Sequence, residues 1–135
     1  MRHSIEFVEG QVPNALVSVS GPMTVEGNRA WLAALIGDAR WRPGMKTLVD
    51  GTGLVPAEFG GSDVRDVAES TLIEADAWGA GSSAVVVGNP AIYGLLRMWQ
   101  VATSAMEWRT EIFYARDEAL AWLAEPRTGD ADTVS

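Results

Sequence analysis

The stretch Ser83-Ala84-Val85-Val86-Val87-Gly88 decides the fold, together with the elements on its C-terminal side. This run is apolar and rich in β-branched residues, which is typical of a strand buried on both faces of a sheet. A helix that starts with Pro comes next at 90–100, then a second strand at 108–114 and a second helix at 117–123. Alternation of strands and helices indicates crossover connections over a largely parallel sheet. The sequence therefore predicts a small α/β domain.

Toward the N-terminus, the sequence predicts a β-hairpin and then a helix. Apolar and polar residues alternate at 3–9, which suits a half-buried strand. Gly, Pro and Asn residues then supply turn chemistry before a second strand at 15–19, so the two strands are expected to pair antiparallel. Thr24 is a good N-cap for the next helix, and Glu26 in its first turn suits the positive end of the helix dipole.

The middle of the chain predicts a third strand and a second helix. The strand runs over 46–50, and a loop interrupted by Gly and Pro occupies 51–61. Ser62 is expected to cap the next helix, whose apolar positions keep a helical period as far as Trp78. The complete order is β-β-α-β-α-β-α-β-α, with about five strands, mostly parallel with an antiparallel edge hairpin.

This order has a consequence for the two faces of the sheet. Crossovers between parallel strands are right-handed almost without exception. If each strand is added beside the last, all the helices are expected on one face, and the opposite face is left to a partner or to solvent. We expect a single domain over 1–124 and a disordered C-terminal tail over 125–135, where the sequence is small and polar.

Composition excludes several classes of function. The chain has 135 residues and a net charge of −8, which argues against binding nucleic acid or an anionic membrane surface. It contains no Cys and one His, His3 near the N-terminus, so a thiolate metal site is impossible and a His-based triad is not expected. No apolar run reaches the ~20 residues that a membrane helix needs. We expect a cytoplasmic protein without metal or cofactor.

Four segments resemble the STAS, or SpoIIAA-like, superfamily and in particular its uncharacterised bacterial branch. They are Gly21-Pro22-Met23-Thr24 before the first helix, Leu48-Val49-Asp50 closing the third strand, and the segments 93–98 and 113–123. The resemblance implies a sequentially ordered parallel sheet with an antiparallel edge, flanked by helices. The fold also resembles the CRAL-TRIO lipid-transfer architecture, which holds an apolar ligand against its sheet.

The best-known members of the superfamily are anti-sigma-factor antagonists, which change partner when they are phosphorylated at the start of the second helix. Their pattern there is Asp-Ser-Ser/Ala-Gly, whereas this chain has Asp50-Gly51-Thr52-Gly53. Only Thr52 and Ser62 could replace the missing serine. Ser62 is thus a possible phosphorylation site, although a plain N-cap role explains it better because Asp63 and Asp66 would repel a phosphate.

Other candidate residues are identified by their positions in the predicted elements. Asp50 ends the third predicted strand, in the middle of the sheet, where it could contact a ligand or simply order the next turn. Asn89 precedes a Pro-started helix, where an anion could bind or the side chain could cap. On the next helix, Tyr93 and Arg97 share a face with Gln100 and Ser104. This mixture is found at protein interfaces, or the stripe is a helix edge whose Tyr covers part of the sheet.

Aromatic residues supply the last candidates. Trp108 and Tyr114 lie on one face of the fifth strand, and they form an exposed aromatic patch if that face points away from the helices. An apolar pocket would be lined by some of the bulky residues on the helical stripes and their neighbours: Trp31, Trp78, Met98, Trp99 and Met106. The alternative for these residues is ordinary core packing.

Three functions remain open from the sequence, of which the third, an enzyme that uses Asp50 with Arg97 or Tyr93, is supported only by those residue types. The first is a non-enzymatic interaction or regulatory module of the STAS-like type, acting as a homodimer and offering its acidic second helix to a basic protein partner. The second is binding of a small apolar molecule or lipid. No pairing of a nucleophile with a base is recognisable, so catalysis is not expected.

Overall fold

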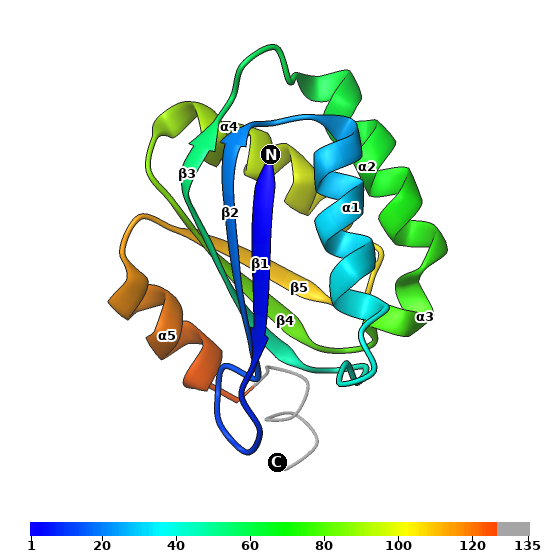
Figure 1. The fold of residues 1–135 in the computed structure, drawn as a ribbon, viewed down its shortest axis with the longest axis vertical. Coiled ribbons are helices and arrows are strands. Elements are labelled where there is room, and N and C mark those ends of the chain that lie inside the picture. The colour runs from blue at the N-terminus through cyan, green and yellow to red at the C-terminus, as the bar shows by residue number, and fades with distance from the viewer. Residues whose placement is uncertain (127–135) are drawn as a thin grey trace.

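The computed structural model describes residues 1–126 and contains a five-stranded sheet with strands in the order β1-β2-β3-β4-β5. The strands are β1 (Arg2–Phe7), β2 (Ala15–Pro22), β3 (Lys46–Val55), β4 (Ser82–Val87) and β5 (Arg109–Phe113). The helices are α1 (Val25–Ile36), α2 (Gly61–Ile73), α3 (Ala75–Trp78), α4 (Pro90–Ala102) and α5 (Arg116–Ala124). Figure 1 shows the strands side by side with helices on both faces of the sheet.

The pairing of the strands confirms the predicted fold class. β1 pairs antiparallel with β2, and each later pair is parallel. β4 lies between β3 and β5 and is buried along its whole length, because both of its faces are covered. That is the environment in which a run of β-branched residues is stable, as the sequence indicated.

Alternating side chains of the sheet build two cores. Val49 and Val85 belong to a large core under α1, α2 and α4, and we call this side the three-helix face. Leu48, Ala84 and Val86 point the other way and pack against Ala119 and Leu123 of α5. We call this side the α5 face.

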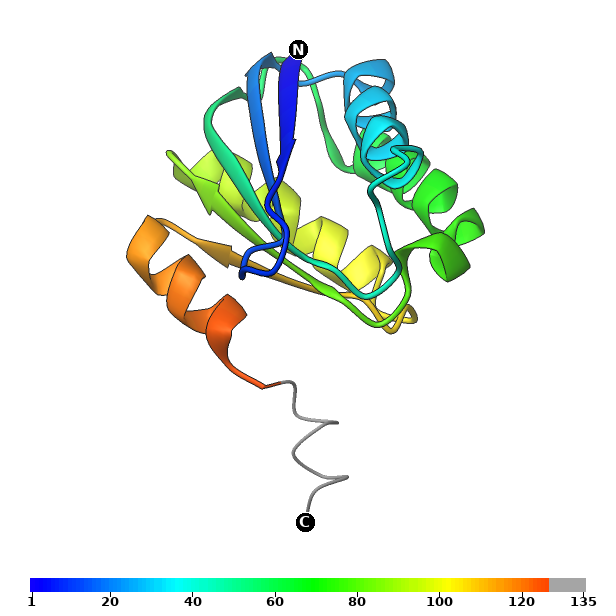
Figure 2. The same cartoon turned by 60° about the horizontal axis from the view of Figure 1, so that its bottom comes forward.

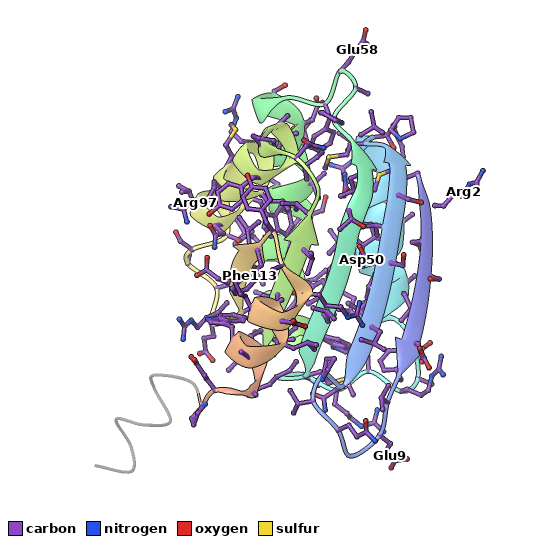
Figure 3. All side chains as sticks on the ribbon, turned by 90° about the vertical axis from the view of Figure 1, so that its left-hand side faces the viewer. Arg2, Glu9, Asp50, Glu58, Arg97 and Phe113 are labelled. Atoms are coloured by element: carbon purple, nitrogen blue, oxygen red, sulfur yellow. The ribbon has the colours of Figure 1, made fainter. Side chains whose placement is uncertain are left out.

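The position of α5 contradicts the expectation that all helices share one face. α1, α2 and α4 each connect, or help to connect, two parallel strands, so the right-handed rule applies to them. α5 comes after the last strand and leads to no further strand, so its side is decided by packing alone. It packs on β4, β3 and β5 from the opposite side (Figure 2). The sheet surface of β1 and β2 on that side carries no helix (Figure 3).

β3 is longer than predicted and takes up the first five residues of the expected loop at 51–61. A shift of register between Ser18 and Ser20 lets β2 continue beside β3, so that Ser20 pairs with Gly53 and Pro22 with Val55. Gly51 and Gly53 are unfavourable residues in a strand, but backbone pairing with β2 on both sides of the register shift outweighs this effect. Only residues 56–60 remain as a connection to α2.

The second predicted helix differs at both ends. It begins at Gly61 with Gly60 as its N-cap residue, and the Asp63 carboxylate accepts a hydrogen bond from the Gly60 N–H at 2.8 Å. Ser62 therefore lies inside the first turn and is not the N-cap residue. The N-cap residue is Gly60, and the Asp63 carboxylate bonds to its backbone N–H. The helix also breaks at Glu74, and the short helix α3 carries Trp78.

Two predicted caps are confirmed. Thr24 accepts from the Gly27 N–H at 2.8 Å, and Asn89 accepts from the Ile92 N–H at 2.9 Å with Pro90 at the start of α4. These bonds are local in sequence, which explains why the residue types alone predicted them. Of the expected tail at 125–135, residues 127–135 lie outside the described part of the chain.

Candidate apolar ligand cavity

A cavity lies between the three-helix face of the sheet and the helices above it. Its volume is about 70 Å³. The sheet provides its floor, α1, α2 and α4 provide its walls, and loop residues complete it. The lining residues are Val19, Met23, Asn28, Trp31, Leu32, Val49, Leu54, Phe59, Val64, Val67, Thr71, Trp78, Ser83, Val85, Leu95, Leu96, Trp99, Thr103, Met106, Trp108 and Thr110. None of these side chains is charged.

The walls of the cavity are bulky side chains that stay half-buried. Trp31 and Leu32 come from α1, and Leu95, Leu96 and Trp99 from α4. All of them keep some contact with solvent, and all except Trp99 pack against the large core. The walls are therefore less completely buried than the core residues beside them.

A cluster of Trp41, Trp78 and Trp108 lies beside the cavity, which Trp78 and Trp108 line and Trp41 does not. The ring centroid of Trp78 lies 5.5 Å from that of Trp41 and 5.0 Å from that of Trp108, both in edge-to-face geometry. Trp41 also donates from its indole N–H to the carbonyl of Ala77 at 2.8 Å. Edge-to-face contacts of this kind add to the burial of the rings themselves.

Most polar groups in the helical walls are already paired. Asn28 donates to the carbonyl of Thr24 at 2.9 Å and accepts from the Trp31 indole at 3.1 Å. Thr71 and Thr103 each donate to a carbonyl one turn earlier in the chain, at 3.0 and 2.8 Å. These groups stabilise the walls and leave few free donors there.

The floor contains a row of hydroxyl side chains that behaves differently. Thr47 of β3 pairs in register with Ser83 of β4, and Ser83 pairs with Thr110 of β5. Residues in register on neighbouring strands point to the same side, so all three face the helices. Thr47 is 0% exposed and its Oγ1 has no hydrogen-bond partner among residues 1–126. We call Thr47, Ser83 and Thr110 the hydroxyl row.

The structure places the predicted aromatic candidates in two groups. Trp99 and Trp108 line the cavity, together with the predicted pocket residues Trp31, Trp78 and Met106. Trp108 thus faces the helices and does not form an exposed aromatic patch with Tyr114. Met98 does not line the cavity and is 41% exposed on the outside of α4.

Tyr93 and Tyr114 form a separate group at the outer edge of the sheet. Their rings stack with centroids 5.1 Å apart and planes inclined by 8°. Arg97, on the same helix as Tyr93, donates to Gln100 at 2.9 Å, and Gln100 in turn donates to the carbonyl of Thr110 on β5. One member of the predicted stripe on α4, Gln100, thus contacts the edge strand β5.

Asp50 lies on the opposite side of the sheet, on the α5 face (Figure 3). It accepts from the Thr52 hydroxyl at 2.7 Å and from the Thr52 N–H at 3.0 Å. The Thr52 hydroxyl lowers the pKa of the Asp50 carboxyl, burial opposes this change, and the Thr52 N–H and the charge of Arg116 lower the pKa further. Both bonds lie within β3, beside its register shift with β2, so the residues after Asp50 form strand and not the turn that the sequence predicted.

A second and more polar cavity of about 160 Å³ surrounds Asp50 on the α5 face. Its lining residues are Ser4, Glu6, Leu16, Val17, Ser18, Leu48, Asp50 and Arg116. Glu6, Ser18 and Arg116 are exposed, so water solvates their charges and hydroxyls. This polar surface explains how β1 and β2 remain stable without a covering helix.

The remaining candidate sites stay apart from both cavities. Ser62 lies in the first turn of α2 and is exposed, and Asn89 is engaged as the cap of α4. Several of the acidic side chains of α2 and the residues after it lie in solvent, including Asp66, Glu69 and Glu74. Nothing in the structure tests phosphorylation or binding at these positions.

The described residues offer neither a metal site nor a membrane span. No group of three or more His, Cys, Asp or Glu residues within 1–126 is arranged to hold a metal ion. No helix in that range is long and apolar enough to span a membrane.

Residues that the sequence did not single out complete the cavity. The hydroxyl row consists of small polar residues inside or beside strands, and the sequence alone does not distinguish such residues from ordinary surface positions. Asn28 was likewise missed, because an amide on an amphipathic helix is usually solvated. The only signal was Ser83 at the start of an otherwise apolar run.

Comparison with known proteins agrees with the fold. A scan of the sequence against protein-family models finds no match, and no curated protein matches it. The structure is similar to that of an uncharacterized protein of the DUF3478 family with a SpoIIAA-like fold, from Shewanella loihica PV-4. The two chains are 18% identical with a TM-score of 0.57, and the match covers 91% of this chain and 93% of the other. This chain therefore has the SpoIIAA-like fold that its sequence resembled.

Proposed function

We propose that this protein is a binding module that holds one small, predominantly apolar molecule in the cavity beneath α1, α2 and α4. The observation that supports the proposal is the cavity itself, which is lined by uncharged and mainly apolar side chains. Ligand sites in proteins are concave, mostly apolar, and carry a few well-placed polar groups. This cavity has all three properties, with the hydroxyl row as its polar part.

The volume limits the size of the ligand. An engineered apolar cavity of about 150 Å³ binds benzene. The cavity here, at about 70 Å³, is roughly half as large and takes a molecule of a few carbon atoms when the helices stay in place. A longer chain would require α1 and α4 to separate, since their side chains Trp31, Leu32, Leu95 and Leu96 form the walls.

A direct test uses 1-chlorobutane, a small apolar probe. We expect it to shift the methyl NMR resonances of Val49, Val85 and Leu95 in a saturable way. The variant Leu95→Phe fills part of the cavity and should weaken binding at least five-fold. The matched control is Leu120→Phe on α5, a half-buried position on the other face of the sheet, which should leave binding unchanged.

The proposal fails if 1-chlorobutane produces no saturable shifts up to its solubility limit. It also fails if both variants weaken binding equally, because the probe would then be responding to general loosening of the protein and not to this cavity.

We propose homodimerisation through the outer side of α4 as a second function, that of an interaction module. Val101 is 72% exposed and Met98 41%, and Tyr114 is 55% exposed beside the stacked Tyr93. Exposed apolar and aromatic side chains with a nearby Arg are typical of interfaces between proteins. A second copy of this chain would cover them. The acidic side chains of α2 would remain available to bind a separate basic partner.

Native mass spectrometry over a range of micromolar concentrations tests the dimer. We expect a mass of two chains for the wild-type protein and of one chain for Val101→Glu, since the substitution places a charge in the interface. Glu118→Ala on α5 is the matched surface control and should remain dimeric. A wild-type protein that is monomeric at high micromolar concentration rules this function out and leaves the cavity proposal standing.

A further inference from the structure

The hydroxyl row includes a hydroxyl group that has no hydrogen-bond partner among residues 1–126. Thr47 is fully buried with an unpartnered Oγ1, and Ser83 is 8% exposed. Leaving a buried hydroxyl without a partner is costly, and native proteins rarely do so. Thr47 does not itself line the cavity, so a ligand can act on this hydroxyl only through Ser83, its neighbour in register.

Ser83 and Thr110 are the members of the row that line the cavity. Neighbouring strands lie about 4.8 Å apart, so side chains in register are close enough for hydroxyls to bond after a rotation about χ1. Ser83 stands between Thr47 and Thr110. It can accept from Thr47 and donate to a ligand oxygen, while Thr110 offers a second donor or acceptor to the same atom.

The charge of the lining restricts the ligand further. No Lys, Arg, Asp or Glu of the described residues lines the cavity. The one amide, Asn28, already bonds to Thr24 and Trp31. An ionised carboxylate or ammonium group would therefore be buried without a counter-charge, which is strongly unfavourable.

We propose that the cavity selects a small neutral molecule carrying one hydrogen-bonding oxygen, an alcohol or a ketone, whose oxygen is bound by the hydroxyl row. Its hydrocarbon part lies against Val49, Val85 and Leu95, which line the same cavity. The inference rests on the proposed function, because it assigns the ligand of the same cavity. It adds a polar contact that the apolar lining alone would not require.

Three probes of equal chain length test this selectivity: butan-1-ol, butanoate and 1-chlorobutane. Their dissociation constants are measured by methyl NMR titration at neutral pH. We expect butan-1-ol to bind at least ten-fold more tightly than butanoate. Ser83→Ala and Thr110→Val should each weaken butan-1-ol about three- to ten-fold, the effect of losing one neutral hydrogen bond. Neither variant should weaken 1-chlorobutane.

Thr71→Val is the matched control, because its hydroxyl lines the cavity but already donates to the Val67 carbonyl. It should leave the ratio of the two affinities, butan-1-ol to 1-chlorobutane, unchanged. Thr47→Val gives a second readout that does not depend on ligand affinity. Because it replaces an unpartnered buried hydroxyl by a methyl group, it should raise the melting temperature of the ligand-free protein.

The outcomes separate the two proposals. If 1-chlorobutane binds but Ser83→Ala and Thr110→Val leave the affinity ratio unchanged, the hydroxyl row does not select the ligand and this inference is wrong, while the cavity function stands. A lower melting temperature for Thr47→Val also contradicts it, because the hydroxyl would then have a partner. If no probe binds, the proposed function itself fails.

Discussion

Trp78→Ala is expected to cost about 3–5 kcal/mol of the free energy of unfolding, the usual loss for a large buried aromatic side chain. Trp78 is 3% exposed and contacts the rings of both Trp41 and Trp108. Its removal leaves a hole between α3, the start of β5 and the loop that carries Trp41. Since a domain of this kind is stable by only about 5–15 kcal/mol, the variant loses a large share of its stability.

Urea unfolding followed by circular dichroism measures this effect, with the midpoint shifting at constant slope. The matched control is Trp122→Ala. Trp122 is half-buried on the α5 face, and its ring contacts Phe113 with the centroids 6.0 Å apart. Its loss should be clearly smaller. Equal losses for the two variants would mean that the cluster beside the cavity is no better packed than the edge of the opposite core.

Gly81→Ala is the second variant with a large expected effect. It should lower the free energy of unfolding by about 1–3 kcal/mol or more, because the added methyl group overpacks the site. A Cβ atom at Gly81 would collide with the carbonyl oxygen of Met45, and it would lie 2.7 Å from the carbonyl carbon of Gly44 and 2.6 Å from Cζ3 of Trp108. Two of these neighbours are backbone, which cannot rotate away. β3 and β4 would have to separate where they begin, next to the hydrogen bond from the Ser82 N–H to Met45.

Gly94→Ala provides a control of opposite sign. Gly94 is exposed inside α4, and a Cβ atom there meets nothing within 4 Å. Because Ala is about 1 kcal/mol more favourable than Gly in a helix interior, this variant should be more stable than the wild type. Thermal unfolding of both variants tests the pair. A Gly81→Ala protein as stable as the wild type would show that the start of β4 is not packed as tightly as the structure indicates.

Local patterns were sufficient for most of the elements. The run 83–88 predicted the central strand because continuous β-branched residues suit a doubly covered position. Thr24 and Asn89 predicted helix starts because capping bonds join residues only about three apart. The end of the second helix was less predictable: its apolar period continues to Trp78, while the backbone breaks at Glu74 to bring Trp78 against Trp41 and Trp108.

The candidate site was predicted only in part. The sequence offered Trp31, Trp78, Trp99 and Met106 as residues of a possible pocket, with ordinary core packing as the alternative, because bulky apolar side chains fall on helical stripes facing a core. Met98, another of those candidates, lies on the outside of α4 and does not line the cavity. Nothing in the chain order places Thr47, Ser83 and Thr110 in one row, because that depends on the register between strands that a helix separates along the chain.

The sequence by itself therefore determined the order of the elements, the parallel sheet with its antiparallel edge, and two of the helix caps. All of these result from hydrophobic periodicity and hydrogen bonds between near neighbours. Only the tertiary structure decided that α5 lies on the opposite face, that β3 extends to Val55, and that a cavity remains above the hydroxyl row. Each of these depends on how residues distant in the chain pack together, and a one-dimensional pattern does not contain that information.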